Sequence, residues 1–202
     1  MSVKKETTFA NVLVLFWFPM TAIAVLAFIN AQISFILISD THFNIPQSNI
    51  GRATSHVLSV AYFVSIFFTP FAGYIYDLFG RTGPILISLF SNIALLLFIP
   101  YSAPRMWLLI LARTLISLNF MVLETSPLVV DYIKSESRGT AVALGTIGML
   151  VGEGFGMAVL LGYSIGMEIE AAHSFAASIL FVMAVIGVFL IREPTIKEHV
   201  RL

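Results

Sequence analysis

The sequence predicts an all-α integral membrane protein with six transmembrane helices, and two observations support this prediction. First, apolar residues make up 58% of the 202 residues, charged residues make up 11%, and the mean hydropathy is +0.96. A soluble domain contains about 25% charged residues, so this chain has too few polar side chains to cover a surface in water. Second, six apolar segments each approach the roughly 20 residues that cross a bilayer. We therefore expect the outer surface to face lipid.

The six apolar segments are separated by short polar connections. Strands are not expected in them, because alternating polar positions are absent and an open sheet edge cannot face hydrocarbon. No long linker divides the chain, so residues 1–202 are expected to form one bundle. The expected spans are Asn11–Ile38, Ala53–Tyr76, Pro84–Tyr101, Met106–Ile133, Thr140–Gly162 and Ala171–Ile191.

The distribution of basic residues predicts the orientation of the bundle. With the N-terminus in the cytosol, only Arg52 and Arg105 lie on the outer side, and Arg113 lies within a span. The positive-inside rule then predicts that both termini are cytosolic, which agrees with an even number of spans. The basic residues placed inside are Lys4, Lys5, Arg81, Lys134, Arg138, Arg192, Lys197 and Arg201.

The composition also argues against several functional classes. A formal net charge of zero provides no basic face for nucleic acid. The absence of Cys excludes disulfides and thiolate chemistry, and the four His residues lack the spacing of metal ligands. The sequence contains no nucleotide-binding loop and no nucleophile motif. We therefore expect neither an enzyme nor a bound cofactor or metal.

The first span is too long for the core of a signal peptide and lacks a small-residue cleavage site, so we expect it to cross the membrane. Its Pro19, like Pro70 and Pro127 further along the chain, is expected to kink a helix. Asn30 and Gln32 are polar residues of this span. These two amides either line a pocket or form hydrogen bonds between helices.

The second span leads into the third through Gly73–Ile85, which reads GYIYDLFGRTGPI. Gly73 removes a side chain where another helix could approach closely. Gly80 and Gly83 permit a turn, and Pro84 suits the first turn of the next helix.

Asp77 and Arg81 in this segment are four residues apart, which is close enough for their side chains to pair. The pair has two interpretations. It is either a surface ion pair beside a tight turn or part of a gate.

Three ionisable residues are expected deep in the membrane: Arg113 and Glu124 in the fourth span and Glu153 in the fifth. Each costs roughly 2.5–3.5 kcal/mol at a helix centre, so each should face protein or water and have a partner. Arg113 and Glu124 are eleven residues apart and share one side of the helix, and Asp131 stays close to that side. This line of charges predicts the wall of a polar cavity.

The partners of these charges are open at this stage. Arg113 and Glu124 are separated by about 16 Å along the helix and cannot pair directly. Glu153 and a bound anion are both candidate partners for Arg113. A carboxylate removed from water holds a proton more readily, so Glu124 or Glu153 could exchange a proton during transport. The alternative is a static buried pair that fixes helix packing.

The fifth span has four glycines at intervals of three or four residues, which places them on one side of the helix. Small residues at this spacing allow two helix backbones to come close. We interpret them as packing residues that do not contact substrate. They are Gly145, Gly148, Gly152 and Gly156.

These motifs occur in the order found in the major facilitator superfamily, and the chain resembles that family along nearly its whole length. The pattern G-x-x-x-D-x-x-G-R at Gly73–Arg81 is similar to its signature loop between spans two and three. Arg113 matches an arginine of span four, and Asp131 with Arg138 resembles the acid and Arg-Gly pair after that span. Residues 145–156, GTIGMLVGEGFG, are similar to a glycine-rich motif of span five.

The resemblance implies a half-bundle: the first six helices of a fold with two six-helix halves and a substrate path between them. It also implies a latch of charged residues at the cytosolic gate. The chain departs from the family pattern at Leu78 and Thr82, where a base is usual, and at Glu153, where Pro is usual. The residues expected in the latch are Asp77, Arg81, Asp131 and Arg138.

Two functions remain as alternatives. The first is a secondary transporter that moves a small solute by alternating access, with possible proton coupling and with a second half supplied by a homodimer or a partner chain. The second is a structural subunit of a larger membrane complex that keeps the fold without transporting. A third interpretation is an incomplete gene product. The costly charges within the spans favour the transporter, because a scaffold has little need of them.

Overall fold

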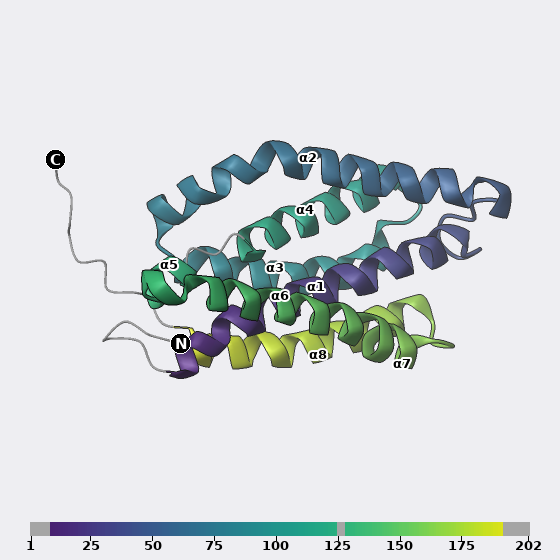
Figure 1. Ribbon diagram of the computed structural model, residues 1–202. Coiled ribbons are helices and arrows are strands. Elements are labelled where there is room, and N and C mark those ends of the chain that lie inside the picture. The colour runs from purple at the N-terminus through teal and green to yellow at the C-terminus, as the bar shows by residue number, and fades with distance from the viewer. Residues whose placement is uncertain (1–8, 125–127, 192–202) are drawn as a thin grey trace.

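The fold class predicted from the sequence is confirmed by the computed structural model, which describes residues 9–124 and 128–191. All the regular elements in these residues are helical (Figure 1). The long helices are α1 (Phe9–Ile38), α2 (Ile50–Phe79), α3 (Thr82–Phe98), α4 (Met106–Glu124), α6 (Arg138–Phe155) and α8 (Ile169–Leu190). The shorter elements are η1 (Gln47–Asn49), η2 (Ile99–Ser102), α5 (Leu128–Tyr132), η3 (Ser135–Ser137), the π-helical η4 (Gly156–Leu161) and α7 (Gly162–Ser164).

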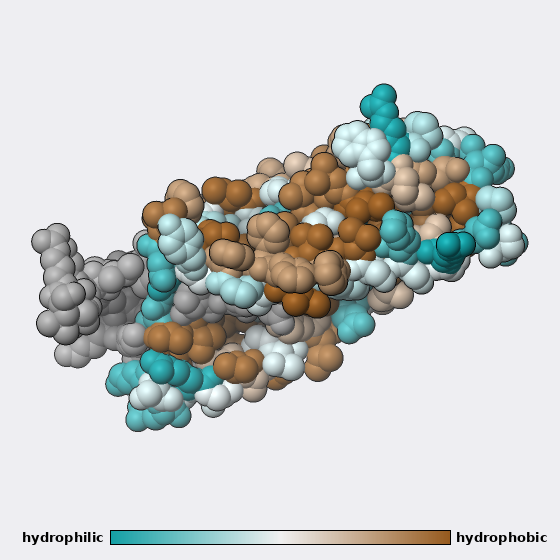
Figure 2. Space-filling view, turned by 90° about the horizontal axis from the view of Figure 1, so that it is seen from above, coloured by the Kyte–Doolittle hydropathy of each residue, from teal (hydrophilic) through white to brown (hydrophobic). Residues whose placement is uncertain are grey.

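Six helical stretches of 21 to 33 residues are long and apolar enough to cross a bilayer. Apolar residues cover most of the middle of the face seen in Figure 2, and hydrophilic residues gather toward its two ends. The protein is therefore an integral, multi-pass membrane protein.

Helix α1 lies at the centre of the described bundle. It packs against α2, α3, α4, α6 and α8, and 67% of its most apolar window is buried. The corresponding buried shares are only 17% for the α2 span and 22% for the span that contains α6. These two spans consequently present the most surface to whatever surrounds the bundle.

Both ends of the described chain lie at the same end of the bundle (Figure 1). There the Asn11 side-chain amide donates a hydrogen bond to the Leu190 carbonyl over 2.8 Å. We call this the terminal end. The opposite end, which holds the α1–α2 connection and the turn before α8, is called the distal end.

Glycine and proline place the turn between α2 and α3. Gly80 has a φ of 77°, a left-handed conformation that disfavours other residues, and α2 ends there. Pro84 lies in the first turn of α3, where its missing N–H leaves no hydrogen bond unmade. Pro19 and Pro70 lie inside α1 and α2, each assigned as one helix; Pro127 is outside the described residues.

Candidate functional site

Three charged side chains meet at the terminal end, and we call them the loop ion cluster. Arg81, in the turn between α2 and α3, donates from Nη1 to Asp77 Oδ1 over 3.2 Å and from Nε to Asp131 Oδ2 over 3.0 Å. Asp77 lies in the last turns of α2, and Asp131 lies in α5. One guanidinium therefore joins elements that are 50 residues apart in the sequence.

The members of the loop ion cluster differ in exposure to water. The side chains of Arg81 and Asp131 are 17% and 24% exposed, whereas that of Asp77 is 76% exposed. Water screens the outer pair more than the inner pair, so the Arg81–Asp131 contact is the stronger of the two.

Tyr76 packs against the loop ion cluster. Its ring lies 5.9 Å from the Arg81 guanidinium carbon, and its hydroxyl donates to the Val122 carbonyl of α4. The tyrosine is buried, so this contact fixes the end of α2 against α4. Tyr76 was not among the residues predicted from the sequence; its hydroxyl within an aromatic segment was the available signal.

The remaining residues expected around this loop have other surroundings. Arg138 opens α6, and its Nε is buried without a hydrogen-bond partner in the described part of the chain, so the expected four-residue latch contains only three ion-paired members. A Cβ added to Gly73 or Gly83 would meet nothing within 4 Å. No described residue therefore packs closely against Gly73, and its role in a close helix approach stays a prediction. Gly80 is the glycine of this turn that has a positive φ.

A second polar group lies within the membrane-spanning region, and we call it the Arg113 cluster. Arg113 of α4 donates from Nη2 to Asn30 Oδ1 over 2.9 Å and from Nη1 to the Ser117 hydroxyl. Its guanidinium carbon lies 5.3 Å from the centre of the Tyr62 ring of α2, and Asn30 Nδ2 lies 3.4 Å from the Tyr62 hydroxyl. Helices α1, α2 and α4 thus meet around one cation.

The Arg113 cluster differs from the polar cavity wall that was expected from the sequence. Arg113 itself is 0% exposed, so its guanidinium does not line an open surface; Tyr62, 42% exposed, and the half-buried Asn30 lie at the edge of the cluster instead. The proposed pairing with Glu153 is also not found, because the ion pairs between described residues do not include Arg113. Glu153 is exposed on α6. Glu124 ends α4, and its side chain is outside the described residues.

The two amides of the first span have separate roles. Asn30 belongs to the Arg113 cluster, whereas Gln32 is buried and donates to the Ser164 hydroxyl of α7 over 3.2 Å. Gln32 therefore joins two helices and does not reach the Arg113 cluster. Asn119 of α4 likewise donates to Asn92 Oδ1 of α3 over 2.9 Å.

The glycines of the fifth span face the backbone of α1. A Cβ added to Gly148 or Gly152 would overlap the carbonyl oxygen of Phe16 or Met20, respectively. A Cβ at Gly156 would lie 2.7 Å from the Ala24 oxygen, and one at Gly145 would lie 3.3 Å from the Leu15 oxygen. Any larger side chain at Gly148, Gly152 or Gly156 would push this span away from α1.

A pocket of about 300 Å³ lies in the terminal half of the bundle between α1, α4, α5 and α6. Its walls are apolar apart from Thr146, and they include Phe18 and Pro19 of α1 and Val142 and Met149 of α6. This volume is at the lower end of the range for small-molecule sites. The pocket can hold an apolar group of modest size.

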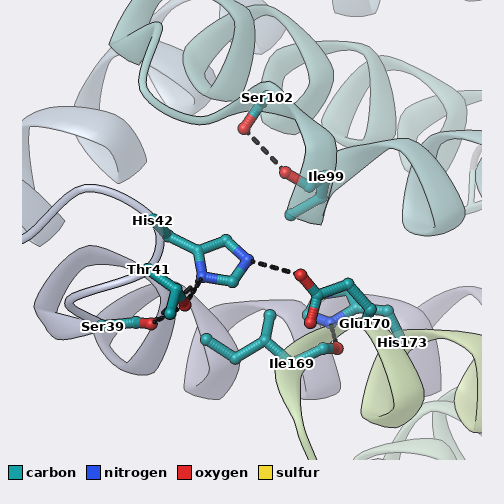
Figure 3. A network of polar contacts seen from close by, with 8 residues as sticks. All are labelled: Ser39, Thr41, His42, Ile99, Ser102, Ile169, Glu170 and His173. Carbon is teal, nitrogen blue, oxygen red and sulfur yellow. Dashed lines mark hydrogen bonds and ion pairs between the residues drawn. The ribbon is translucent and has the colours of Figure 1, made fainter.

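The distal end has its own polar network, which connects the α1–α2 connection to α8 (Figure 3). His42 Nε2 lies 3.3 Å from Glu170 Oε1, and its Nδ1 contacts the hydroxyls of Ser39 and Thr41. The buried His173 donates from Nδ1 to the Ile169 carbonyl over 2.8 Å. No group of three or more acidic or histidine side chains among the described residues is arranged to hold a metal ion.

Comparison with known proteins adds one finding. A family model described as Major Facilitator Superfamily matches residues 12–201. A search of curated proteins found no match for the chain.

Proposed function

Because the chain belongs to the major facilitator superfamily, we propose that it moves a small solute across the membrane by alternating access. Members of this superfamily are generally transporters rather than enzymes. The chain acts as one half of the carrier, and a second copy or a separate chain supplies the other half. In this proposal the terminal end is cytosolic, as the basic residues predict.

The loop ion cluster is the observation that carries the proposal. Through Arg81 it ties the α2–α3 turn to α5 at one end of the bundle, with a mostly buried guanidinium and Asp131 as its inner pair. Breaking such a pair leaves a partly buried charge without its partner, which is costly. The cluster can therefore hold the terminal end closed in one state and release it in another, as a two-state element must.

The open faces of α2 and α6 support the need for a second half. These helices expose large apolar side chains along the bundle, among them Phe63 and Phe67 of α2 and Ile147 and Leu150 of α6. They also expose Glu153, whose ionised form is costly beside lipid. Either a protein surface or a water-filled path in front of α6 removes that cost. The water-filled path also allows Glu153 to exchange a proton.

Thiol labelling tests alternating access, because the chain contains no Cys and any introduced thiol is unique. Thr146→Cys reports on the pocket near the terminal end, and Ser34→Cys reports on the distal half of α1. In proteoliposomes, we expect Asp131→Asn to speed labelling of Cys at 146 by a charged maleimide and to slow labelling at 34. Glu136→Gln, which neutralises an exposed acid outside the cluster, should change neither rate. Rates that rise or fall together at both positions contradict a two-state exchange of access.

The structural-subunit alternative is supported by one observation. Arg113 is enclosed by its own half-bundle rather than facing an open path, as a residue that only fixes helix packing would be. On this alternative, Asp131→Asn leaves both labelling rates unchanged and instead weakens association with neighbouring subunits. Native purification of the variant from its membrane, with detection of co-purified chains, distinguishes the two functions.

A further inference from the structure

We propose that the pocket and Glu153 together form a binding site for a lipophilic organic cation. This inference rests on the proposed function, because it names the class of solute that the half-bundle receives. It begins from the geometry of α6. Val142, Thr146 and Met149 line the pocket, and Glu153 follows Met149 by four residues in the same regular helix.

The helical repeat places Glu153 on the pocket side of α6. Positions 142, 146, 149 and 153 are spaced by four, three and four residues, so their side chains share one stripe of the helix. The glycines of α6 lie on the adjoining side of the helix, against the α1 backbone, and Gly145 also lines the pocket. Glu153 is exposed and lies about 6 Å beyond Met149 along the helix, toward the distal end. The carboxylate is therefore within reach of a molecule whose apolar part occupies the pocket.

Among the described side chains, the α1 face that extends from the pocket toward the distal end presents no accessible cation. Asn30 is eleven residues beyond the pocket residue Pro19 and on the same side of α1, so this face leads from the pocket to the Arg113 cluster. There Arg113 is 0% exposed behind Asn30, Ser117 and Tyr62. An anion cannot contact a guanidinium that is fully enclosed. The accessible charge along this path, among the described side chains, is the carboxylate of Glu153.

These features fit a cation with an apolar body. An exposed carboxylate that lacks an ion-pair partner in the described part of the chain attracts positive charge strongly where the surroundings exclude water. The apolar pocket of about 300 Å³ accepts the body of the molecule. A basic side chain from a second half is the competing partner for Glu153, and the experiment below distinguishes it from a solute.

Tetraphenylphosphonium and tetraphenylborate provide the test, since they have nearly the same shape and opposite charge. We expect full-length protein in nanodiscs, with empty nanodiscs as the blank, to bind the phosphonium ion and not the borate ion. Glu153→Gln should weaken phosphonium binding by at least about tenfold. Glu153→Asp, which keeps the charge, should retain it within about threefold. Glu168→Gln removes an exposed acid outside the pocket that makes no capping hydrogen bond, and it should leave binding unchanged.

A second variant acts on the pocket and keeps the carboxylate. Met149→Trp fills part of the lining and should also weaken phosphonium binding, which decides the question if Glu153→Gln fails to fold. Equal binding of the two ions, full binding by Glu153→Gln, or loss of self-association without loss of phosphonium binding would overturn the site. Thiol labelling of the same preparations keeps the two proposals separate. Exchange of access without cation selectivity refutes only the cation site, and cation selectivity without exchange of access refutes only the transporter.

Discussion

The positive charges of two arginines in this half-bundle are stabilised in different ways. Arg81 lies at the terminal end and is neutralised by two carboxylates, one of them well exposed to water. Arg113 lies within a span, is fully buried, and is held by the neutral groups of Asn30, Ser117 and Tyr62. Arg81 therefore forms ion pairs that can be separated, whereas Arg113 is a buried cation surrounded by neutral polar groups.

The difference indicates which cluster can act as a switch. Separating Arg81 from Asp131 exposes both groups at the edge of the bundle, where water can solvate them, so the open state is accessible. Removing Arg113 from its shell would place a cation against apolar side chains and hydrocarbon, which is far more costly. The Arg113 cluster is accordingly expected to stay closed while the loop ion cluster opens.

Arg81→Gln gives the largest effect expected from this comparison. The substitution removes both ion pairs and leaves Asp131 mostly buried without its partner, so we expect the free energy of unfolding to fall by about 2 kcal/mol. Reversible unfolding in mixed micelles measures it. The matched control is Arg52→Gln, an exposed arginine at the start of α2. An equal loss in the two variants would show that the cluster contributes no special stability.

The two acids of the loop ion cluster should differ in their effects. Asp131→Asn is expected to destabilise by about 1–2 kcal/mol, because the Arg81–Asp131 contact is mostly shielded from water. Asp77→Asn is expected to cost about 0–1 kcal/mol, since Asp77 is largely exposed. The same unfolding measurement, repeated at high salt, should shrink the Asp77 effect more than the Asp131 effect. A larger loss of stability for Asp77→Asn than for Asp131→Asn would contradict this prediction, because it would make the exposed Arg81–Asp77 pair the stronger one.

Arg113→Met is expected to change the free energy of unfolding little. It loses the hydrogen bonds to Asn30 and Ser117, but it also removes the cost of burying a cation without a carboxylate. These terms oppose each other, and we expect the free energy of unfolding to stay within about 1 kcal/mol of the unaltered protein. A loss as large as that of Arg81→Gln would contradict the comparison, because it would make Arg113 a dominant packing element.

Local features of the sequence were enough to predict several parts of the structure. The length and hydropathy of each segment predicted the six spans, since a bilayer requires about 20 apolar residues for each crossing. The contact between Asp77 and Arg81 agrees with their separation by only four residues, although α2 ends at Phe79 and Arg81 lies in the turn that follows. The spacing of the fifth-span glycines follows the helical repeat, which places them on one side of the helix independently of the helix that packs there.

What the tertiary structure decided is the rotation of each helix and the choice of its neighbours. Asn30 and Gln32 are two residues apart and face different helices, one toward Arg113 and the other toward Ser164. No local signal distinguishes them, because in a lipid-embedded bundle both the lipid-facing and the packed sides of a helix are apolar. The inclusion of Asp131 in the loop ion cluster, the exclusion of Arg138 and the enclosure of Arg113 depend on the same rotations. Hydropathy therefore determined where the chain crosses the membrane, and helix packing determined which polar groups meet inside it.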